Sequence, residues 1–545
     1  MGKREPMTLL LNAVRTSAVN KQKILIRSVN WIGDAVLTIP AIKAIRNAFP
    51  EAHISLLTKP WTAEIFSGNP DIDEIILYDK TFKGITGKFR LAKILRSSCF
   101  DTAILLQNAF DAAFLTWLAR IPERIGYKRD CRGFLLTKGI PVPVEIPGQH
   151  QVNYYLNIVR AIQENIEETP PYIHLTDNER QWARELIASK LHDPHLPLIG
   201  INPGAAYGSA KRWPPGNFAE LIMKIINDLN GRVIIFGSQA EVEIANEIIN
   251  EINVLKIKKR IEFGSRIMVM SGKTSLRELA ALISECDAFI TNDSGPMHIA
   301  SALHVPTAAI FGSTDPAATG PFGKSHKVIT TNLPCSPCLK RKCPEKHLAC
   351  MTEITPDMVF GSLNEILPMQ RAVFLDKDGT IIEDKNYLNS FDNLVILPLA
   401  KKNLQQLKTA GFKLIGITNQ SGIGRGIVDE QFVIESNELL QKKLGIDDFY
   451  YCPHHPDDKC SCRKPEHLMM LEARLDHGID LKRSYVIGDK ESDVLLGKNT
   501  GATGVLLSAT PLFDKSSAAF IAKDLSEAVE WILKREIRLG RSFQL

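Results

Sequence analysis

Short β-rich apolar runs alternate with amphipathic helical stretches along this chain, and the alternation begins three times. The run "KILIRSV" from residue 23 is followed by the helical stretch "WIGDAVLTIPAIKAIRNAF" and then by the run "HISLLT". The same order begins again at about residue 196 with "LPLIGIN", and a third time at Arg371. Strands that alternate with helices of this length form parallel sheets with crossover helices. The sequence therefore predicts an α/β protein built from three parallel-sheet units.

Two breaks divide these units. Residues 142–195 are rich in Pro, Glu and helix formers, and "EILPMQR" ends a helix with Pro368. A length of 545 residues agrees with several domains, because single hydrophobic cores seldom grow beyond ~250 residues. We expect one parallel-sheet domain over 23–195, a second over 196–368 that faces the first, and an independent domain over 369–545.

Composition excludes several classes of partner. The formal net charge is +5 and the basic runs at 256–260 and 340–342 are short, so no nucleic acid is expected to bind. No apolar run approaches the ~20 residues of a membrane span. Met7–Val14 lacks a convincing cleavage site, which argues against a signal peptide. We expect a cytoplasmic protein and leave open a peripheral contact with the inner membrane.

Two carboxylates follow the first predicted strand of the third unit. In "FLDKDGTIIE", Asp376 and Asp378 share one loop, and Gly379 permits a tight turn. One carboxylate can attack phosphorus while the other shuttles a proton, and a divalent cation offsets the charge repulsion. Further polar residues follow in order at strand or loop ends: Thr418 in "GITNQSG", Arg463 and Lys464 in "CRKP", and Asp489 in "VIGDKESD". This order predicts a phosphoryl-transfer site.

A metal-binding pattern lies between these motifs. The segment "YCPHHPDDKCSCRKP" supplies Cys452, His454, Cys460 and Cys462. Four such donors suit a closed tetrahedral zinc site, in which the bound ion would hold the two ends of the loop together. Clustering in a cytoplasmic protein favours metal over disulfide, and the alternative is reduced cysteines near a loop.

A second cysteine cluster lies upstream, in "CSPCLKRKCPEKHLAC". It contains Cys335, Cys338, Cys343 and Cys350, with His347 as a further possible donor. Its spacing is irregular for a zinc site. Zinc binding and reduced thiols both remain open here.

Three motifs of the first two units suit a phosphorylated ligand. Gly33 and Asp34 follow the first strand at the start of a helix, whose amides can accept negative charge. In "NPGAAYGSAKRWP", a Gly-rich loop ends in Lys211 and Arg212, which suit a diphosphate. In "TNDSGPMHIASAL", a strand runs into a helix near Ser294. These motifs predict binding of phosphate groups at these loops and helix ends.

The third unit resembles the haloacid dehalogenase superfamily of phosphatases over residues 371–530. The resemblance implies that Asp376 is the nucleophile and Asp378 the general acid/base. It also implies that Thr418 and Lys464 bind the transferring phosphoryl group. Mg²⁺ would be held by Asp376, the backbone carbonyl of Asp378, and Asp489.

Within this superfamily, the zinc loop and "TNQSGIGRG" resemble compact phosphatases that act on D-glycero-D-manno-heptose 1,7-bisphosphate, and their relatives that act on histidinol phosphate. The resemblance implies that Arg463 helps to recognise the substrate. It places around the substrate Asp384, Lys385, Asn386, Tyr387, Asn419, Gln420, Ser421 and Lys490. The zinc loop is short, as in the histidinol-phosphate relatives, so this unit alone leaves its substrate open.

The first two units resemble the heptosyltransferases of lipopolysaccharide inner-core assembly, over residues 23–366, chiefly through "WIGD" and "SGPMH". That family has a GT-B arrangement of two Rossmann-like domains and transfers heptose from ADP-L-glycero-D-manno-heptose with inversion. The resemblance implies that Asp34 is the general base and that Lys211 balances charge on the departing ADP. It places Asp293, Ser294, Gly295 and His298 at the donor site. The acceptor would be of the heptosyl-Kdo-lipid A type, and no cofactor is expected for the transfer.

The two resemblances support one interpretation. A heptose phosphatase acts early in making the ADP-heptose donor that a heptosyltransferase consumes, so the chain would join two enzymes of one pathway. Two alternatives stay open: the third unit hydrolyses histidinol phosphate, or one of the two enzymes is an inactive binding scaffold.

Overall fold

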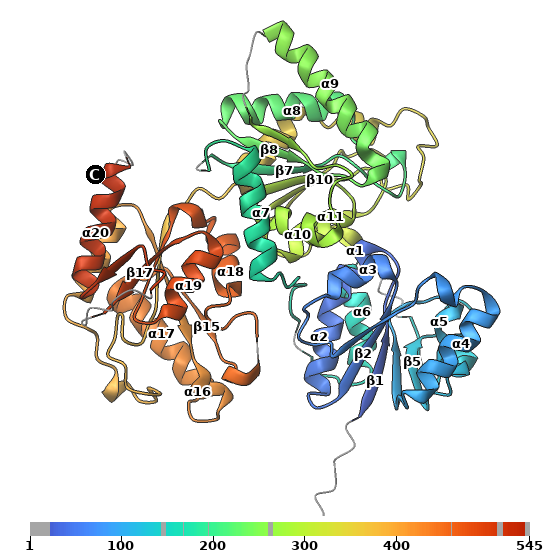
Figure 1. Cartoon of the computed structure of the whole chain (residues 1–545), viewed down its shortest axis with the longest axis horizontal. Helices are drawn as coiled ribbons and strands as arrows, with labels where there is room; N and C mark the ends of the chain where they lie inside the picture. Colours follow the sequence, from blue (N-terminus) through green and yellow to red (C-terminus); the bar gives the residue numbers. More distant parts are fainter. Residues whose placement is uncertain are drawn as a thin grey trace, which may run out of the picture.

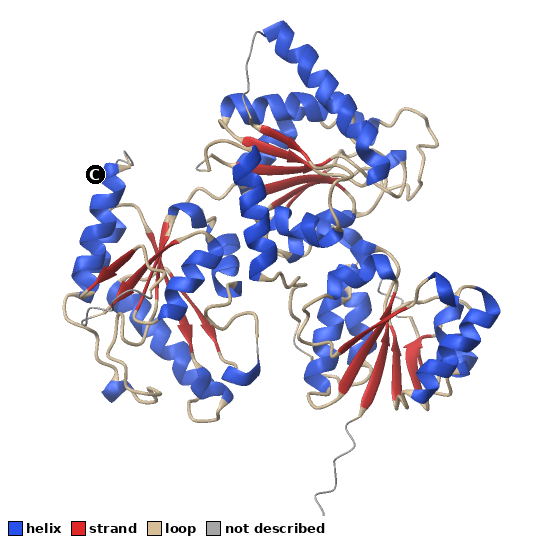
Figure 2. Cartoon of the chain, in the orientation of Figure 1, coloured by secondary structure: helices blue, strands red, loops and turns tan. Residues whose placement is uncertain are grey.

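A computed structural model describes residues 22–142, 149–166, 168–194, 196–259, 265–458, 460–508 and 516–539, with only the backbone described for 256–259. It contains three six-stranded sheets, and all the pairs between named strands are parallel (Figures 1 and 2). The predicted α/β class with three sheets is thus confirmed. Met7–Val14, where the sequence argues against a signal peptide, lies outside the described residues.

The first sheet has the order β3-β2-β1-β4-β5-β6. Its strands are β1 (Lys23–Arg27), β2 (His53–Thr58), β3 (Glu74–Leu77), β4 (Thr102–Leu105), β5 (Glu123–Tyr127) and β6 (Lys138–Ile140). Its helices are α1 (Ile32–Leu37), α2 (Ile39–Ala48), α3 (Pro60–Ala63), α4 (Gly84–Ser97), α5 (Phe110–Leu118) and α6 (Gln151–Arg160). In the central strand β1, the residues Ile24, Leu25 and Ile26 are apolar and fully buried, as expected of a sheet covered on both faces.

The second sheet has the order β12-β11-β10-β7-β8-β9. Its strands are β7 (Leu198–Asn202), β8 (Arg232–Ile235), β9 (Ile267–Val269), β10 (Ala288–Asn292), β11 (Thr307–Ile310) and β12 (Lys327–Ile329). The helices around it are α7 (Asp177–Lys190), α8 (Pro215–Asp228), α9 (Val242–Lys259), α10 (Leu276–Ser284), α11 (Gly295–Ala302), α12 (Pro316–Thr319), α13 (Ala349–Thr352) and α14 (Pro356–Ile366).

Helix α7 precedes the predicted boundary at residue 195 but packs against α10 of the second sheet. Helix α6 packs against α2 of the first sheet instead. We therefore propose that the first domain ends between α6 and α7, earlier than the sequence predicts. Residue 195 itself lies outside the described residues.

The third sheet has the order β15-β14-β13-β16-β17-β18. Its strands are β13 (Ala372–Leu375), β14 (Lys413–Asn419), β15 (Asp448–Cys452), β16 (Tyr485–Gly488), β17 (Thr503–Leu507) and β18 (Phe520–Ala522). Its helices are α15 (Ala400–Thr409), α16 (Ser421–Gly424), α17 (Glu430–Leu444), α18 (Leu468–His477), α19 (Glu491–Thr500) and α20 (Leu525–Arg538). Buried apolar side chains of these elements form cores on both faces of the sheet.

The third domain has its own core but is docked on the second through a polar interface. Lys482 Nζ lies 2.9 Å from Asp287 Oδ1, and Arg474 Nη2 donates to the carbonyl of Asp287 at 3.0 Å. The Tyr172 hydroxyl lies 3.2 Å from His467 Nε2, and both side chains are buried. The sequence predicted an independent third unit and missed this contact, because the partners are far apart in the chain.

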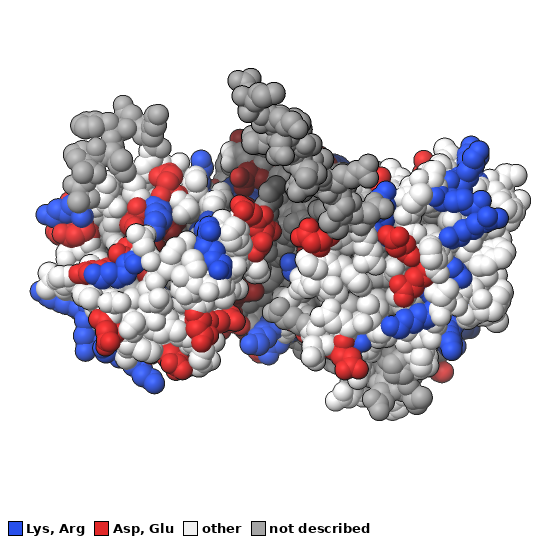
Figure 3. Space-filling model, turned by 90° about the horizontal axis from the view of Figure 1, so that it is seen from below, with Lys and Arg blue, Asp and Glu red and all other residues white. Residues whose placement is uncertain are grey.

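The surface carries both signs of charge. Figure 3 shows basic and acidic side chains interspersed over the two lobes visible there, without one continuous area of a single sign. In the part of the chain that the structure describes, we find no helix with the length and apolar character needed to cross a membrane.

Candidate active sites

The predicted phosphoryl site forms at the carboxyl ends of three neighbouring strands. Asp376 follows β13, Thr418 ends the buried part of β14, and Asp489 follows β16. Strand β13 lies between the other two in the sheet. The connections that follow neighbouring strands on the two sides of β13 run in opposite directions. A crevice therefore opens at this edge of the sheet, where ligands of α/β proteins bind.

Lys464 reaches this edge from the loop before α18. Its ammonium lies 2.6 Å from Asp376 Oδ1 and 2.7 Å from Asp493 Oδ1, and it donates to the Ile417 carbonyl at 3.0 Å. Burial alone would lower the pKa of Lys464, but Asp376 and Asp493 together raise it above its usual value. A permanent positive charge is therefore held beside the predicted nucleophile.

Asp493 is a site residue that the sequence analysis missed. Its carboxylate, with those of Asp376 and Asp489, places one oxygen each within 4.8 Å of the others. Asp489 lies just before α19 and Asp493 lies in the first turn of that helix, and this pair of carboxylates after a strand was the available signal. Three clustered carboxylates are the hard oxygen donors that Mg²⁺ prefers.

The carboxylates of this cluster suit a bound cation. Burial, more than the neighbouring carboxylates, raises the pKa of Asp489 to about 6, against the opposing effect of Lys490. Within the described residues, the buried atom Asp489 Oδ1 has no hydrogen-bond partner. Gly379, at φ +85°, leaves room beside it, because a Cβ there would lie 2.4 Å from Asp489 Oδ2. A divalent cation would satisfy the orphaned oxygen and offset the crowded negative charge.

Gln420 connects the second predicted catalytic carboxylate to the phosphoryl side of the site. Its amide nitrogen donates to Asp378 Oδ2 at 3.0 Å and to Thr418 Oγ1 at 2.9 Å. Burial, and to a smaller extent the charge of Asp376, raises the pKa of Asp378. A raised pKa favours the protonated form, which can donate a proton to a leaving group.

Some of the other predicted substrate residues are linked to this edge of the sheet by hydrogen bonds or ion pairs, and their role in binding the substrate stays a prediction. Asn419 exchanges hydrogen bonds with the backbone of Lys464, at 2.9 and 3.2 Å, and Ser421 begins α16. Lys490 Nζ lies 3.6 Å from Asp384 Oδ2, whose other oxygen accepts from the Asn386 amide. Tyr387 is exposed, and Arg463 keeps one buried guanidinium nitrogen without a hydrogen-bond partner among the described residues. Lys385 pairs instead with Glu383.

The four predicted zinc ligands lie together. Cys452 Sγ is 3.4 Å from Cys460 Sγ and 3.5 Å from His454 Nδ1, and Cys462 Sγ is 3.2 Å from the same nitrogen. Ligands at ~2.0–2.3 Å from a tetrahedral zinc ion are separated from one another by roughly these distances. His455, the neighbouring histidine, pairs with Asp457 on the surface and stays outside the cluster.

In the transferase half, helices α1 and α11 meet at their N-terminal ends between the first two domains (Figure 1). Gly33 permits this approach, because a Cβ there would lie 2.7 Å from the His298 ring. Gly295 lies against Ile32 in the same way. Two helix N-termini, each with unpaired amides that favour negative charge, thus converge at one place.

Asp34 lies in the first turn of α1 and His298 lies on α11. Burial raises the pKa of Asp34 to about 6, and the positive charge of Lys211 opposes the shift. Burial lowers the pKa of His298 to about 4, so its imidazole is neutral at pH 7. Asp34 therefore remains largely ionised at neutral pH, yet it is basic enough to take a proton.

Lys211 contacts the side chains of Asp293 and Tyr207. It forms an ion pair with Asp293, whose Oδ2 also accepts from the Thr314 hydroxyl at 2.5 Å. Its ammonium lies 4.5 Å from the centre of the Tyr207 ring. Ser294 Oγ accepts from the Asn202 amide at 3.2 Å. Sequence reasoning missed Thr314, although the motif "FGSTDP" at a strand end was its signal.

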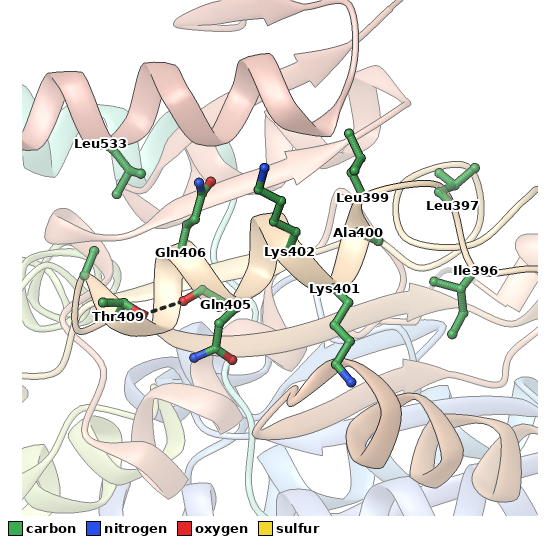
Figure 4. Close-up of a pocket in the computed structure, with 11 residues that line it drawn as sticks. Ile396, Leu397, Leu399, Ala400, Lys401, Lys402, Gln405, Gln406, Thr409 and Leu533 are labelled. Atoms are coloured by element: carbon green, nitrogen blue, oxygen red, sulfur yellow. Dashed lines mark hydrogen bonds between the residues drawn. The ribbon is translucent and has the colours of Figure 1, made fainter.

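A cavity of about 840 Å³ lies in the third domain (Figure 4). It is lined by residues of α15, the loop before it and Leu533 of α20. Its lining contains no residue of either predicted site, and we assign no role to it.

Comparison with known proteins matches both halves of the chain. The model of "Glycosyltransferase family 9 (heptosyltransferase)" matches residues 88–349, and a HAD-hydrolase-like model matches residues 461–528. Lipooligosaccharide heptosyltransferase 2 of Haemophilus influenzae is 30% identical over 356 residues, covering 63% of this chain and 99% of that protein. D-glycero-beta-D-manno-heptose-1,7-bisphosphate 7-phosphatase of Helicobacter pylori J99 is 39% identical over 175 residues, covering 31% of this chain and 99% of that protein.

The structure of Escherichia coli ADP-heptose LPS heptosyltransferase II matches with a TM-score of 0.54 and 27% identity, covering 64% of this chain and 98% of that chain. Together with the two sites, these matches define a glycosyltransferase joined to a phosphatase. The chain belongs to the heptosyltransferases of glycosyltransferase family 9 over its first two domains and to the HAD-type heptose-bisphosphate phosphatases over its third. Both resemblances seen in the sequence are confirmed.

Proposed function

We propose that the chain is a bifunctional enzyme of lipopolysaccharide inner-core synthesis. It transfers heptose from ADP-L-glycero-D-manno-heptose to a heptosyl-Kdo-lipid A type acceptor, and it removes the 7-phosphate of D-glycero-D-manno-heptose 1,7-bisphosphate. The observation that carries the proposal is that each half of the chain covers nearly the whole length of relatives with these two activities. The acceptor would be reached from the cytoplasmic side of the membrane.

For the transfer, Asp34 accepts the proton of the acceptor hydroxyl while the oxygen attacks the anomeric carbon of the donor. The bond from that carbon to the departing ADP breaks with inversion. Lys211 and the amides at the N-terminus of α11 offset the charge that grows on the diphosphate. Asp34 reaches the site from the first domain and His298 from the second, so the base and the donor site meet only when the two domains face each other.

For the hydrolysis, Asp376 attacks phosphorus and forms an aspartyl-phosphate, while Asp378 gives a proton to the departing sugar oxygen. Asp378 then takes a proton from the water that hydrolyses the intermediate, which restores both carboxylates. Lys464 and Thr418 hold the phosphoryl oxygens. Mg²⁺, bound by Asp376, the carbonyl of Asp378, Asp489 and the further ligand Asp493, would shield the nucleophile from the negative charge of the phosphate.

The Cys452–His454–Cys460–Cys462 cluster is proposed to hold a structural zinc ion. The loop 452–462 ends next to Arg463 and Lys464, so the ion would fix the segment that presents both cations to the substrate. A closed set of four protein ligands leaves no open position for catalysis.

Replacing Cys460 and Cys462 with Ser is expected to release about one zinc ion per chain, because the metal loses half of its ligands. The melting temperature of the third domain should fall, since the binding energy of a structural metal contributes to folding. Elemental analysis and calorimetry measure both effects. His455→Asn, which alters the neighbouring histidine outside the cluster, is the control and should keep the metal. Unchanged zinc content in the double Ser variant would contradict the assignment.

The proposed function is tested by giving the purified chain each substrate separately. We expect phosphate release from heptose 1,7-bisphosphate, little release from histidinol phosphate, and ADP release from ADP-heptose only when acceptor is present. Preference for histidinol phosphate would support the alternative phosphatase. Failure of one reaction while the other proceeds would make the silent unit a binding scaffold.

A further inference from the structure

The four cysteines at 335–350 are not used by either proposed reaction. Cys335, Cys338, Cys343 and Cys350 nevertheless line a single cavity of about 20 Å³, together with His347. That volume is about what one water-sized sphere occupies. All four are free thiols and none forms a disulfide.

The segment that carries these cysteines is largely irregular in structure. Between β12 and α13 it contains no helix or strand among the described residues, and Leu339 is 61% exposed. Two hydrogen bonds tie it to the loop after β11: Ser336 Oγ donates to the Gly312 carbonyl at 2.6 Å, and the Leu339 amide donates to the Ser313 carbonyl at 2.7 Å. Small exposed loops without an apolar core are commonly stabilised by disulfides or metal ions.

The same segment packs on the loop that carries Lys211. The Ala210 amide donates to the Arg341 carbonyl at 3.2 Å, and the Tyr207 hydroxyl donates to the Leu339 carbonyl at 3.2 Å. The Arg341 guanidinium lies 5.2 Å from the centre of the Tyr207 ring. Ala210, the neighbour of Lys211 in sequence, lines the cysteine cavity itself.

We propose that these four cysteines form a tetrathiolate site for one soft metal ion, Zn²⁺ or Fe²⁺, which fastens the segment 335–350 over the Lys211 loop. The Cys335-x-x-Cys338 pair has the spacing of a two-ligand bite on such an ion. The groups of possible metal ligands that already lie within 4.8 Å of one another, among the described residues, belong to the third domain. Among the described residues, no three of the four sulfur atoms at 335–350 lie within 4.8 Å of one another, so binding of the ion requires these sulfur atoms to move closer together. The metal site is independent of the proposed transfer, and only its effect on Lys211 rests on that function.

The first test counts metal in the full-length chain purified without added chelator. Elemental analysis for zinc and iron is expected to find about two ions per chain, one in each cysteine cluster. The Cys335→Ser/Cys338→Ser variant should hold about one fewer, and the Cys460→Ser/Cys462→Ser variant should lose the other. Zinc and iron are told apart by the analysis itself and by the visible absorbance of an iron–thiolate site. Equal metal content in the Cys335/Cys338 variant and the unmodified chain would overturn the proposal.

The second test asks what the ion does. The Cys335→Ser/Cys338→Ser variant should lose ~10–100-fold in kcat/KM for transfer, the usual cost of removing support from behind a site residue. Hydrolysis of heptose bisphosphate should be unchanged, which shows that the third domain remains folded, and the far-ultraviolet circular dichroism of the whole chain should also be unchanged, which shows that the transferase half is folded. Loss of the metal without loss of transfer would leave the site but remove its link to Lys211. Absence of transfer in the unmodified chain would refute the proposed function and leave the metal count standing.

Discussion

Asp376→Asn is expected to abolish hydrolysis of heptose 1,7-bisphosphate and to leave heptosyl transfer nearly intact. An amide oxygen cannot attack phosphorus as a carboxylate does, so the rate should fall by ~10⁴–10⁶, as for removal of a nucleophile in other covalent enzymes. Transfer should persist because Asp376 follows β13 of the third sheet, whereas the transferase residues lie on the other two sheets. Phosphate release and ADP release, assayed on the same preparation, measure the two effects.

The surroundings of Asp376 allow a clean comparison. In the Asn variant Lys464 keeps its ion pair with Asp493, so the buried ammonium is not left without a counter-charge. Asp392→Asn changes an exposed carboxylate of the same domain and is the matched control, with both activities expected unchanged. Equal loss of both activities in the Asp376 variant would mean that the two units depend on each other, and the separation of roles would be wrong.

The strands and the residues at their ends were predictable because local signals specify them. The runs at 371–375 and 484–488 are short, apolar and β-rich, and they form β13 and β16 nearly as expected. Asp376 and Asp489 come directly after these runs, so parallel pairing of the strands brings them to the same edge. The apolar pattern of the strands and the position of each carboxylate directly after a strand are enough to predict this part of the site.

The parts that sequence reasoning missed depend on contacts across the fold. Gln420 was predicted to border the substrate, but its hydrogen bond to Asp378 depends on how the ends of β13 and β14 are placed in space. Docking of the third domain depends on Asp287 and Lys482, which meet only after both sheets have formed. Single charged residues such as these are usually exposed to solvent, so nothing in the local sequence distinguishes Asp287 or Lys482 from ordinary surface residues.

The transferase mechanism also makes a prediction for the pH dependence of stability. The pKa of Asp34 in the folded chain is about 6, above its usual value of 3.8. Between these two pH values Asp34 is ionised in the unfolded chain but still protonated in the folded chain. The free energy of unfolding therefore decreases as pH rises from about 4 to about 6, and this loss comes from Asp34. Asp34→Asn should remove this loss, and its melting temperature at pH 7 should equal or exceed that of the unmodified chain.

The same variant should lose transfer, and this combination distinguishes a base from a structural residue. Asn keeps the size of Asp34 and some of its hydrogen bonding but lacks a basic oxygen, so turnover should fall by ~10²–10⁴, the usual contribution of general-base catalysis. In the unmodified chain, kcat/KM should rise with pH through about 6, where Asp34 ionises. Calorimetric titration of ADP-heptose should find donor binding little changed, because Lys211 and α11 remain in place.

The alternative is that Asp34 only stabilises the start of α1, a role that Asn performs about as well. The geometry disfavours it, since Trp31 occupies the N-cap position and Asp34 lies inside the first turn. Asp130→Asn, at an exposed position of the same domain, is the control and should transfer heptose at the normal rate. A rate assay with heptosyl-Kdo-lipid A as acceptor decides between the two roles. If Asp34→Asn turns over at a near-normal rate, the role of Asp34 is to stabilise the start of α1. Another group between the facing domains must then remove the proton from the acceptor hydroxyl.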